Sequence, residues 1–175
     1  QPTEIYSGLS NSKAFMFVYN GILYLLNGSQ YIQYDGTTVK SVNPYKPRIS
    51  MNRKPDGSTS EVDESWNMLG RGFINTFNGD GTTKVFKLSL TGLDSDTVVS
   101  NVGGTEGNGF TVDRTAGTVT FNTAPPQGTN NVEITAYKTF PKLAENILKC
   151  KFGVEFSNRM FLGGNEDLPN YYFAA

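Results

Sequence analysis

Alternation of apolar and polar residues, broken by turn residues, is the feature of this sequence that most restricts its fold. The alternation is clearest in three segments: residues 73–90, 110–121 and 132–137. Such a period of two, with Gly, Asn, Asp and Pro at the breaks, is typical of short antiparallel strands that bury one face. The pattern predicts a small β-sandwich or barrel, with a tight reversal at Ala116–Gly117. Four apolar residues are expected to share its core: Phe86, Val119, Phe121 and Ile134.

The flanking residues show a second β pattern. Strand-like runs at 13–19 and 22–26 are joined by Asn20–Gly21, the strongest two-residue hairpin signal. Further elements are expected from the same reasoning: a strand at 30–34, a short helical turn at 143–148, and a hairpin at 150–162 that turns around Ser157, Asn158 and Arg159. A meander of this kind is typical of one propeller blade.

The fold class that follows is all-β. A small antiparallel β-sandwich or barrel module, residues 72–138, is predicted to be inserted between β-meander, partly propeller-like flanks, residues 1–71 and 139–175. Residues 43–60 contain three prolines and end in the polar run Asp56–Ser60. This composition predicts a linker or an exposed excursion before the module.

Composition excludes several functional classes. The chain has no His, so a Ser-His-Asp or Cys-His catalytic arrangement cannot be built. Its single cysteine, Cys150, cannot form an internal disulfide, and we interpret it as a buried structural thiol. The 15 basic and 16 acidic residues give no basic excess for nucleic acid. No apolar run approaches the roughly 20 residues of a membrane span. We expect no catalytic residues, no cofactor and no metal.

Oxygen-rich and acidic motifs are the features of the sequence that oppose this expectation. Asn78–Gly81 and the pair Asp94 and Asp96 offer ligands of the type calcium prefers, but neither has EF-hand spacing, and turns are the simpler interpretation. Asp63–Glu64 and Glu166–Asp167 are paired carboxylates of the residue type used in glycoside hydrolysis. Adjacent residues of a strand point to opposite faces, so neither pair can flank one glycosidic bond by itself.

Interaction with other molecules is the remaining functional class. Six residues are candidates for it: the aromatic Tyr45, Trp66, Tyr171 and Tyr172, and the basic Arg48 and Arg53. Exposed aromatic rings stack on sugars, whereas most Tyr and Trp in sheets are half-buried packing residues. The two arginines lie in the proline-rich segment 43–58, from which contacts to neighbouring chains are expected. Solvated or salt-bridged side chains are the simpler interpretation of these arginines, and binding of nucleic acid is the alternative.

The order of these motifs resembles proteins of bacteriophage tails. In the module, the resemblance is carried by Gly79-Asp-Gly-Thr-Thr83, Gly117-Thr-Val-Thr-Phe121, Thr123-Ala-Pro-Pro126 and Asn131-Val-Glu-Ile-Thr135. In the flanks it is carried by Gln33-Tyr-Asp-Gly-Thr-Thr-Val39, Lys151-Phe-Gly-Val154 and Pro169-Asn-Tyr-Tyr172. The resemblance implies a non-enzymatic virion protein of the tail or baseplate, assembled in the host cytoplasm. Its partners would be other virion proteins and further copies of itself, with a receptor or host-surface glycan as the alternative.

The flanks hold too few strands for a closed propeller, which is where the chain departs from that family. A few strands need a second layer to be stable. We therefore expect hairpin 150–162 to pack on the first meander, so that Phe152, Val154 and Phe156 face Phe15, Phe17 and Leu23. The ends, Gln1–Pro2 and Ala174–Ala175, indicate a piece of a longer protein.

Overall fold

A computed structural model describes residues 4–106, 109–157 and 159–174. The interpretation of the chain ends depends on Gln1, Pro2 and Ala175, which lie outside the described residues. The same is true of Asn158 in the predicted turn. The fold is nearly all β, with 42% strand and 4% helix, in several sheets of which none is closed. The contacts divide the chain into two compact units: unit 1, residues 1–44 and 141–175, and unit 2, residues 45–140.

Unit 1 contains two small antiparallel sheets and the single helix assigned in the described residues. The first sheet is a meander in the order β1 (Phe15–Tyr19), β2 (Ile22–Leu26), β3 (Tyr31–Tyr34) and β4 (Val39–Ser41). The second sheet has the order β13 (Phe152–Phe156), β14 (Arg159–Gly163) and β15 (Phe173–Ala174), and helix α1 spans Leu143–Leu148. The predicted hairpins and the helical turn are confirmed. Asn20 and Gly21 both have positive φ, as their two-residue turn requires.

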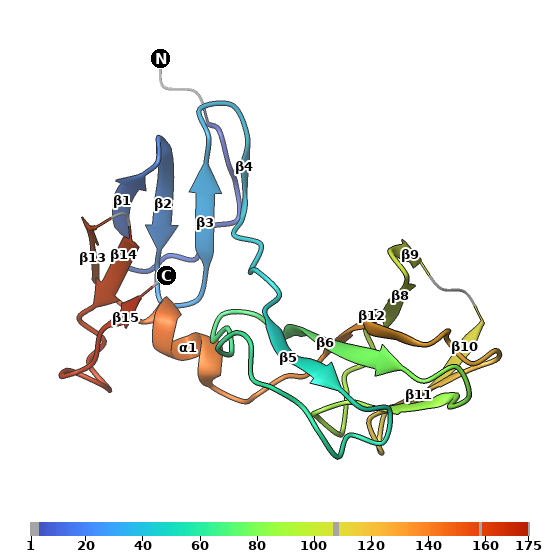
Figure 1. The fold of residues 1–175 in the computed structure, drawn as a ribbon. Coiled ribbons are helices and arrows are strands. Elements are labelled where there is room, and N and C mark those ends of the chain that lie inside the picture. The colour runs from blue at the N-terminus through green and yellow to red at the C-terminus, as the bar shows by residue number, and fades with distance from the viewer. Residues whose placement is uncertain (1–3, 107–108, 158, 175) are drawn as a thin grey trace. The chain divides into compact units, whose positions relative to one another are not determined.

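The two sheets of unit 1 meet at their edges. Strand β13 runs beside β1, as Figure 1 shows in red and blue. The contact is close, since a Cβ on Gly153 would lie 3.5 Å from the ring of Phe17. That ring is also stacked on Tyr24, with centroids 5.3 Å apart. Hairpin 150–162 therefore supplies part of the second layer that the meander requires.

Unit 2 is sandwich-like, with two sheets around one core. The larger sheet has the order β5 (Arg48–Arg53), β6 (Gly72–Gly79), β12 (Gly128–Tyr137), β8 (Val99–Val102) and β9 (Thr105–Glu106). The smaller has the order β10 (Phe110–Asp113), β11 (Thr118–Phe121) and β7 (Val85–Lys87). Phe86, Val119, Phe121 and Ile134 belong to one buried cluster, which confirms the predicted core. The rings of Phe77 and Phe121 meet that of Phe86 edge to face at 5.3 and 5.2 Å.

Strand β5 is the main departure from the sequence interpretation of this region. Residues 48–53 form a strand, not a linker, and pair with β6 in parallel. Parallel neighbours need a long crossover, which residues 54–71 provide. Prolines 47 and 55 stand outside the strand, where they remove no ladder hydrogen bond. Unit 2 thus contains residues 45–71, which the sequence assigns to the flank, as well as the predicted module 72–138.

Candidate interaction surfaces

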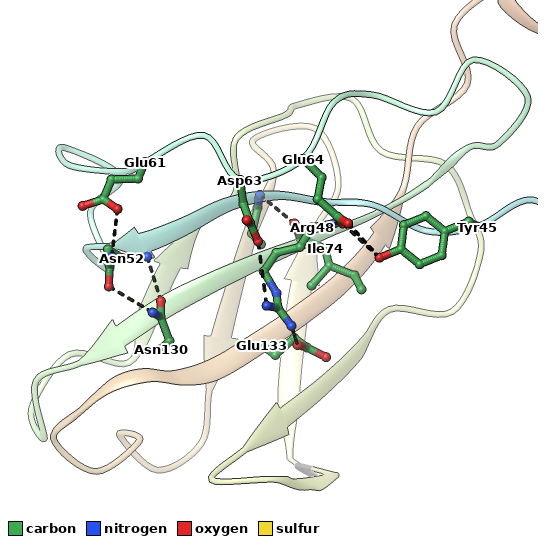
Figure 2. Close-up of polar contacts among 10 residues, drawn as sticks. Tyr45, Arg48, Asn52, Glu61, Asp63, Glu64, Ile74, Asn130 and Glu133 are labelled. Carbon is green, nitrogen blue, oxygen red and sulfur yellow. Dashed lines mark hydrogen bonds and ion pairs between the residues drawn. The ribbon is translucent and has the colours of Figure 1, made fainter. Parts of the chain in front are cut away.

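Tyr45, Glu64 and Arg48 join the residue 61–64 segment to the start of β5 (Figure 2). The Tyr45 hydroxyl donates to the Glu64 carboxylate, with both oxygens at 3.0 Å. The main-chain N–H of Arg48 donates to Glu64 Oε2 at 2.6 Å, and the Glu64 N–H donates back to the Arg48 carbonyl at 2.9 Å. The hydrogen bond to Glu64 raises the pKa of Tyr45. Tyr45 is exposed, but its hydroxyl is engaged within the chain.

The Arg48 guanidinium lies between two carboxylates on the surface of unit 2. It is 3.8 Å from Asp63 and 3.4 Å from Glu133 of β12. Figure 2 shows the side chain reaching across the strands between them. Since Asp63 faces Arg48 and Glu64 faces Tyr45, the two adjacent acids serve separate structural contacts. Of the two alternatives for Arg48, the structure shows the salt bridge.

Asn52 and Asn130 hold two strand irregularities against each other. The Asn52 N–H donates to Asn130 Oδ1 at 2.7 Å, and Asn130 Nδ2 donates to Asn52 Oδ1 at 3.0 Å. Both residues have positive φ, which Asn tolerates better than most side chains. Each lies where its strand shifts register against β6. Asn52 Nδ2 also donates to Glu61 at 3.0 Å, completing the polar surface drawn in Figure 2.

Arg53 is buried and therefore is not a surface contact residue. Its Nε donates to the Lys87 carbonyl at 2.9 Å, its Nη1 donates to Ser60 Oγ at 3.1 Å, and its Nη2 donates to the Leu88 carbonyl at 3.4 Å. Burial lowers the pKa of its guanidinium. The sequence prediction of Arg53 as an interaction residue is therefore wrong: its three hydrogen bonds tie the end of β5 to Ser60 of the crossover and to Lys87 and Leu88 at the end of β7.

Arg53 and Arg48 form a matched pair for substitution. We expect Arg53→Met to lower the free energy of unfolding of unit 2 by about 2–3 kcal/mol, because it leaves buried carbonyls without donors. Arg48→Met removes only exposed ion pairs and is expected to cost less than about 1 kcal/mol. Urea unfolding followed by Trp66 fluorescence measures both. Equal losses would show that the buried contacts of Arg53 contribute no more than a surface charge.

Trp66 is half-buried and packs inside unit 2. Its ring meets Phe140 edge to face at 4.8 Å and lies tilted on Phe73 at 5.8 Å. The indole Nε1 is buried, and no described residue accepts a hydrogen bond from it. Of the two alternatives for this Trp, the packing role is the one that these contacts support.

Tyr171 and Tyr172 are as strongly exposed as Tyr45. They precede β15 in unit 1, and the ring of Tyr172 lies 5.9 Å from that of Phe161 in β14. The six candidates are thus not brought together: Tyr45, Arg48, Arg53 and Trp66 belong to unit 2, and the two tyrosines belong to unit 1.

Exposed apolar side chains on β1 and β13 were not among the predicted candidates. Met16 and Val18 of β1 are exposed, as are Phe152, Val154 and Phe156 of β13. The expectation that the β13 residues face the first meander is wrong. Gly153 faces Phe17 instead, and the buried face of the hairpin is formed by Met160 and Leu162 of β14. A possible sequence signal is the run Phe15–Tyr19, which is apolar on both faces of one strand.

A pocket of about 470 Å³ lies within unit 1. Its walls include Lys149 and Asp167, whose charged atoms are 2.7 Å apart, and Lys151, which is paired with Glu166. Cys150 also lines it, and its thiol donates to the Asn146 carbonyl at 3.4 Å. Burial raises the pKa of Cys150 to about 11, so the thiol is protonated at neutral pH. The acids Glu166 and Asp167 each pair with a lysine.

Cys150 is accordingly expected to react slowly with thiol reagents in the folded chain. At pH 8 we expect its modification by a disulfide reagent to be about 100-fold slower than in urea, because the thiolate fraction and the access are both reduced. The absorbance of the released thiol measures the rate. A native rate equal to that in urea would contradict a buried thiol.

The oxygen-rich motifs are engaged in turns and ion pairs. Asp80 accepts from the Thr83 hydroxyl and from the main-chain N–H groups of Thr82 and Thr83, which hold the pKa of its carboxyl well below the usual range. Asp94 and Asp96 each accept from Arg71 at 2.9 Å. Within the described ranges, no three Asp, Glu or Cys side chains converge as a metal site. Nor does any described helix have the length and apolarity to cross a membrane.

Comparison with family models, with curated proteins and with solved structures finds no match to this chain.

Proposed function

We propose that this chain is a non-enzymatic structural component of a bacteriophage virion, in the tail or baseplate, and that it acts through protein–protein contacts. The observation that carries the proposal is the row of exposed apolar side chains on β13, with Met16 and Val18 on β1. Contiguous exposed apolar side chains mark interaction sites more often than they mark ordinary surface. The resemblance of the sequence motifs to phage tail proteins supports the virion as the place of those contacts.

The polar residues support a structural role over a catalytic one. A chain without His lacks the commonest general base. Glu64, Asp94 and Asp96 accept hydrogen bonds that tie segments of unit 2 together. The thiol of Cys150 is protonated and buried, and so is a poor nucleophile.

The proposal is tested by determining whether the chain is present in virus particles and where in the particle it lies. Particles purified from cultures that express the gene would be analysed by quantitative proteomics and by immunogold electron microscopy. We expect the chain at a fixed ratio to other virion proteins, with label on the tail in place of the head. Particles that lack the chain, while the culture lysate contains it, would overturn the proposal.

A receptor- or glycan-binding role is the second candidate, because Tyr171 and Tyr172 are adjacent and exposed. On the structural proposal, we expect no saturable binding on a panel of bacterial surface glycans, and no hydrolysis of them. Binding that Tyr171→Ala/Tyr172→Ala abolishes would favour the second candidate. Tyr45→Ala, at an exposed tyrosine of unit 2, is the matched control. Calorimetry and reducing-end release measure the two activities.

A further inference from the structure

We propose that two copies of this chain associate through the exposed face of the β13–β14–β15 sheet, which we call the β13 face, to form a two-fold dimer. The β13 face consists of Phe152, Val154, Phe156, Phe161 and Tyr172. This inference deepens the proposed function, on which it rests for its biological role, by naming the partner of that surface.

The β13 face carries the kind of pattern that normally marks a buried face. Phe152, Val154 and Phe156 alternate with Gly153 and Glu155 along the strand. In an antiparallel sheet with one solvated side, the apolar set of such an alternation faces the core. Here Gly153 takes the inner side, where an added Cβ would lie 3.0 Å from Leu162 and 3.3 Å from Met160, so the β14 side chains leave little room for a larger residue. The apolar set is therefore directed outward, and a second copy can supply the layer that it lacks.

The size of the β13 face fits the centre of a protein interface. Phe152, Val154, Phe156 and Tyr172 are 53%, 56%, 69% and 72% exposed. With about 200 Å² for a whole aromatic side chain, these four expose roughly 500 Å². A specific interface buries about 800 Å² per partner, as an apolar centre with a polar rim. The exposed apolar side chains thus account for more than half of the area that one partner buries in such an interface.

One side chain of the face is held rigid in advance. The ring of Phe152 lies over the main chain of Gly163 and Gly164, where an added Cβ would come within 2.7 and 2.9 Å of ring atoms. Because the ring already packs on these two glycines, it loses little conformational freedom when a partner covers it. Aromatic anchors of this sort dominate interface energetics.

Charge permits a second copy and decides its orientation. The face is uncharged except at the hairpin end, where Arg159 stands opposite Phe156. Two copies packed with their strands in the same direction would bring the two Arg159 side chains together. With the strands in opposite directions, these charges lie at opposite ends, roughly 15 Å apart for a five-residue strand. The middle residue of β13, Val154, then meets its own copy near the two-fold axis.

Self-association of the full chain tests the proposal. Sedimentation equilibrium over a wide range of concentration is expected to show a reversible dimer. Val154→Glu should weaken it at least about tenfold, because a carboxylate would be buried without a partner. Val62→Glu makes the same change at a valine of unit 2 that is 86% exposed, and should leave the dimer unchanged. If circular dichroism shows that Val154→Glu is misfolded, Phe156→Glu takes its place.

Cross-linking tests the orientation. With a short bismaleimide, Val154→Cys is expected to give a covalent dimer and Arg159→Cys is not, while Cys150 in the unmodified chain gives the background. Efficient linkage through position 159 in place of position 154 would overturn the arrangement with the strands in opposite directions. A chain that stays monomeric, or a dimer that Val154→Glu and Phe156→Glu leave intact, would overturn the β13 face as the contact.

These outcomes are separate from those of the proposed function. A monomeric chain found in purified particles would overturn the dimer alone. A dimer that depends on Val154, from a chain absent from particles, would overturn the virion role alone.

Discussion

Phe86→Ala is expected to lower the free energy of unfolding of unit 2 by about 3–5 kcal/mol. Phe86 is fully buried between Phe77 and Phe121, which it meets edge to face, and it joins the smaller sheet to the larger one. Its removal takes away apolar burial and leaves a cavity that fixed strands cannot close. A loss of this size is a large part of the stability of a domain.

Trp66 makes this measurement specific to unit 2. It is the only Trp of the chain and packs on Phe73 of the same core. Urea unfolding followed by its fluorescence therefore reports the loss in that unit. Val85→Ala, one position away on β7 but exposed, is the matched control and is expected to cost less than about 1 kcal/mol. Similar losses at the two positions would contradict a core centred on Phe86.

Gly117→Ala is expected to cost about 3 kcal/mol or more. Gly117 ends the β10–β11 loop with a φ of 67°, and its carbonyl accepts from the Leu88 N–H at 2.9 Å. A Cβ at this position would overlap the Leu90 carbonyl oxygen, and neither main-chain segment can move without breaking the β7–β11 pairing. The loss of stability thus has two parts: the strain of a non-glycine residue in the left-handed backbone conformation, and the steric overlap of its Cβ with the main chain at Leu90.

Gly103 separates these two contributions. It also has a positive φ, 59°, but an added Cβ would meet nothing within 4 Å. Gly103→Ala is therefore expected to cost only the conformational strain, about 1–2 kcal/mol. Urea unfolding of both variants gives the difference, which is the steric part. Equal costs would mean that the loop at Leu90 moves aside.

The candidate surfaces show where prediction from sequence was limited. Tyr45 and Arg48 are exposed, but their polar groups bind Glu64, Asp63 and Glu133, the last of which is 85 residues away from Arg48 in the chain. Arg53 looks like a surface charge in a proline-rich segment, yet it is buried because β5 pairs in parallel with β6. Contacts between residues so far apart in the sequence depend on which strands become neighbours in the sheet.

Local sequence determined the alternating strands of 73–90, 110–121 and 132–137, the turns beside them and the core of unit 2. Alternation of apolar residues and the turn preferences of Asn20–Gly21 and Gly117 act over a few residues, so each could be interpreted without knowledge of the rest of the chain. The shared core of Phe86, Val119, Phe121 and Ile134 followed from that alternation.

Only the tertiary structure decided the pairing of β5 and the direction in which β13 faces. A parallel pair joined by a long crossover leaves no local signal, unlike a hairpin turn. The alternation in Phe152–Phe156 shows that one face of the strand is apolar, but it does not say what will cover that face. Gly153 lies on the side of β13 that packs against Leu162 and Met160, so Phe152, Val154 and Phe156 lie on the opposite side and are exposed.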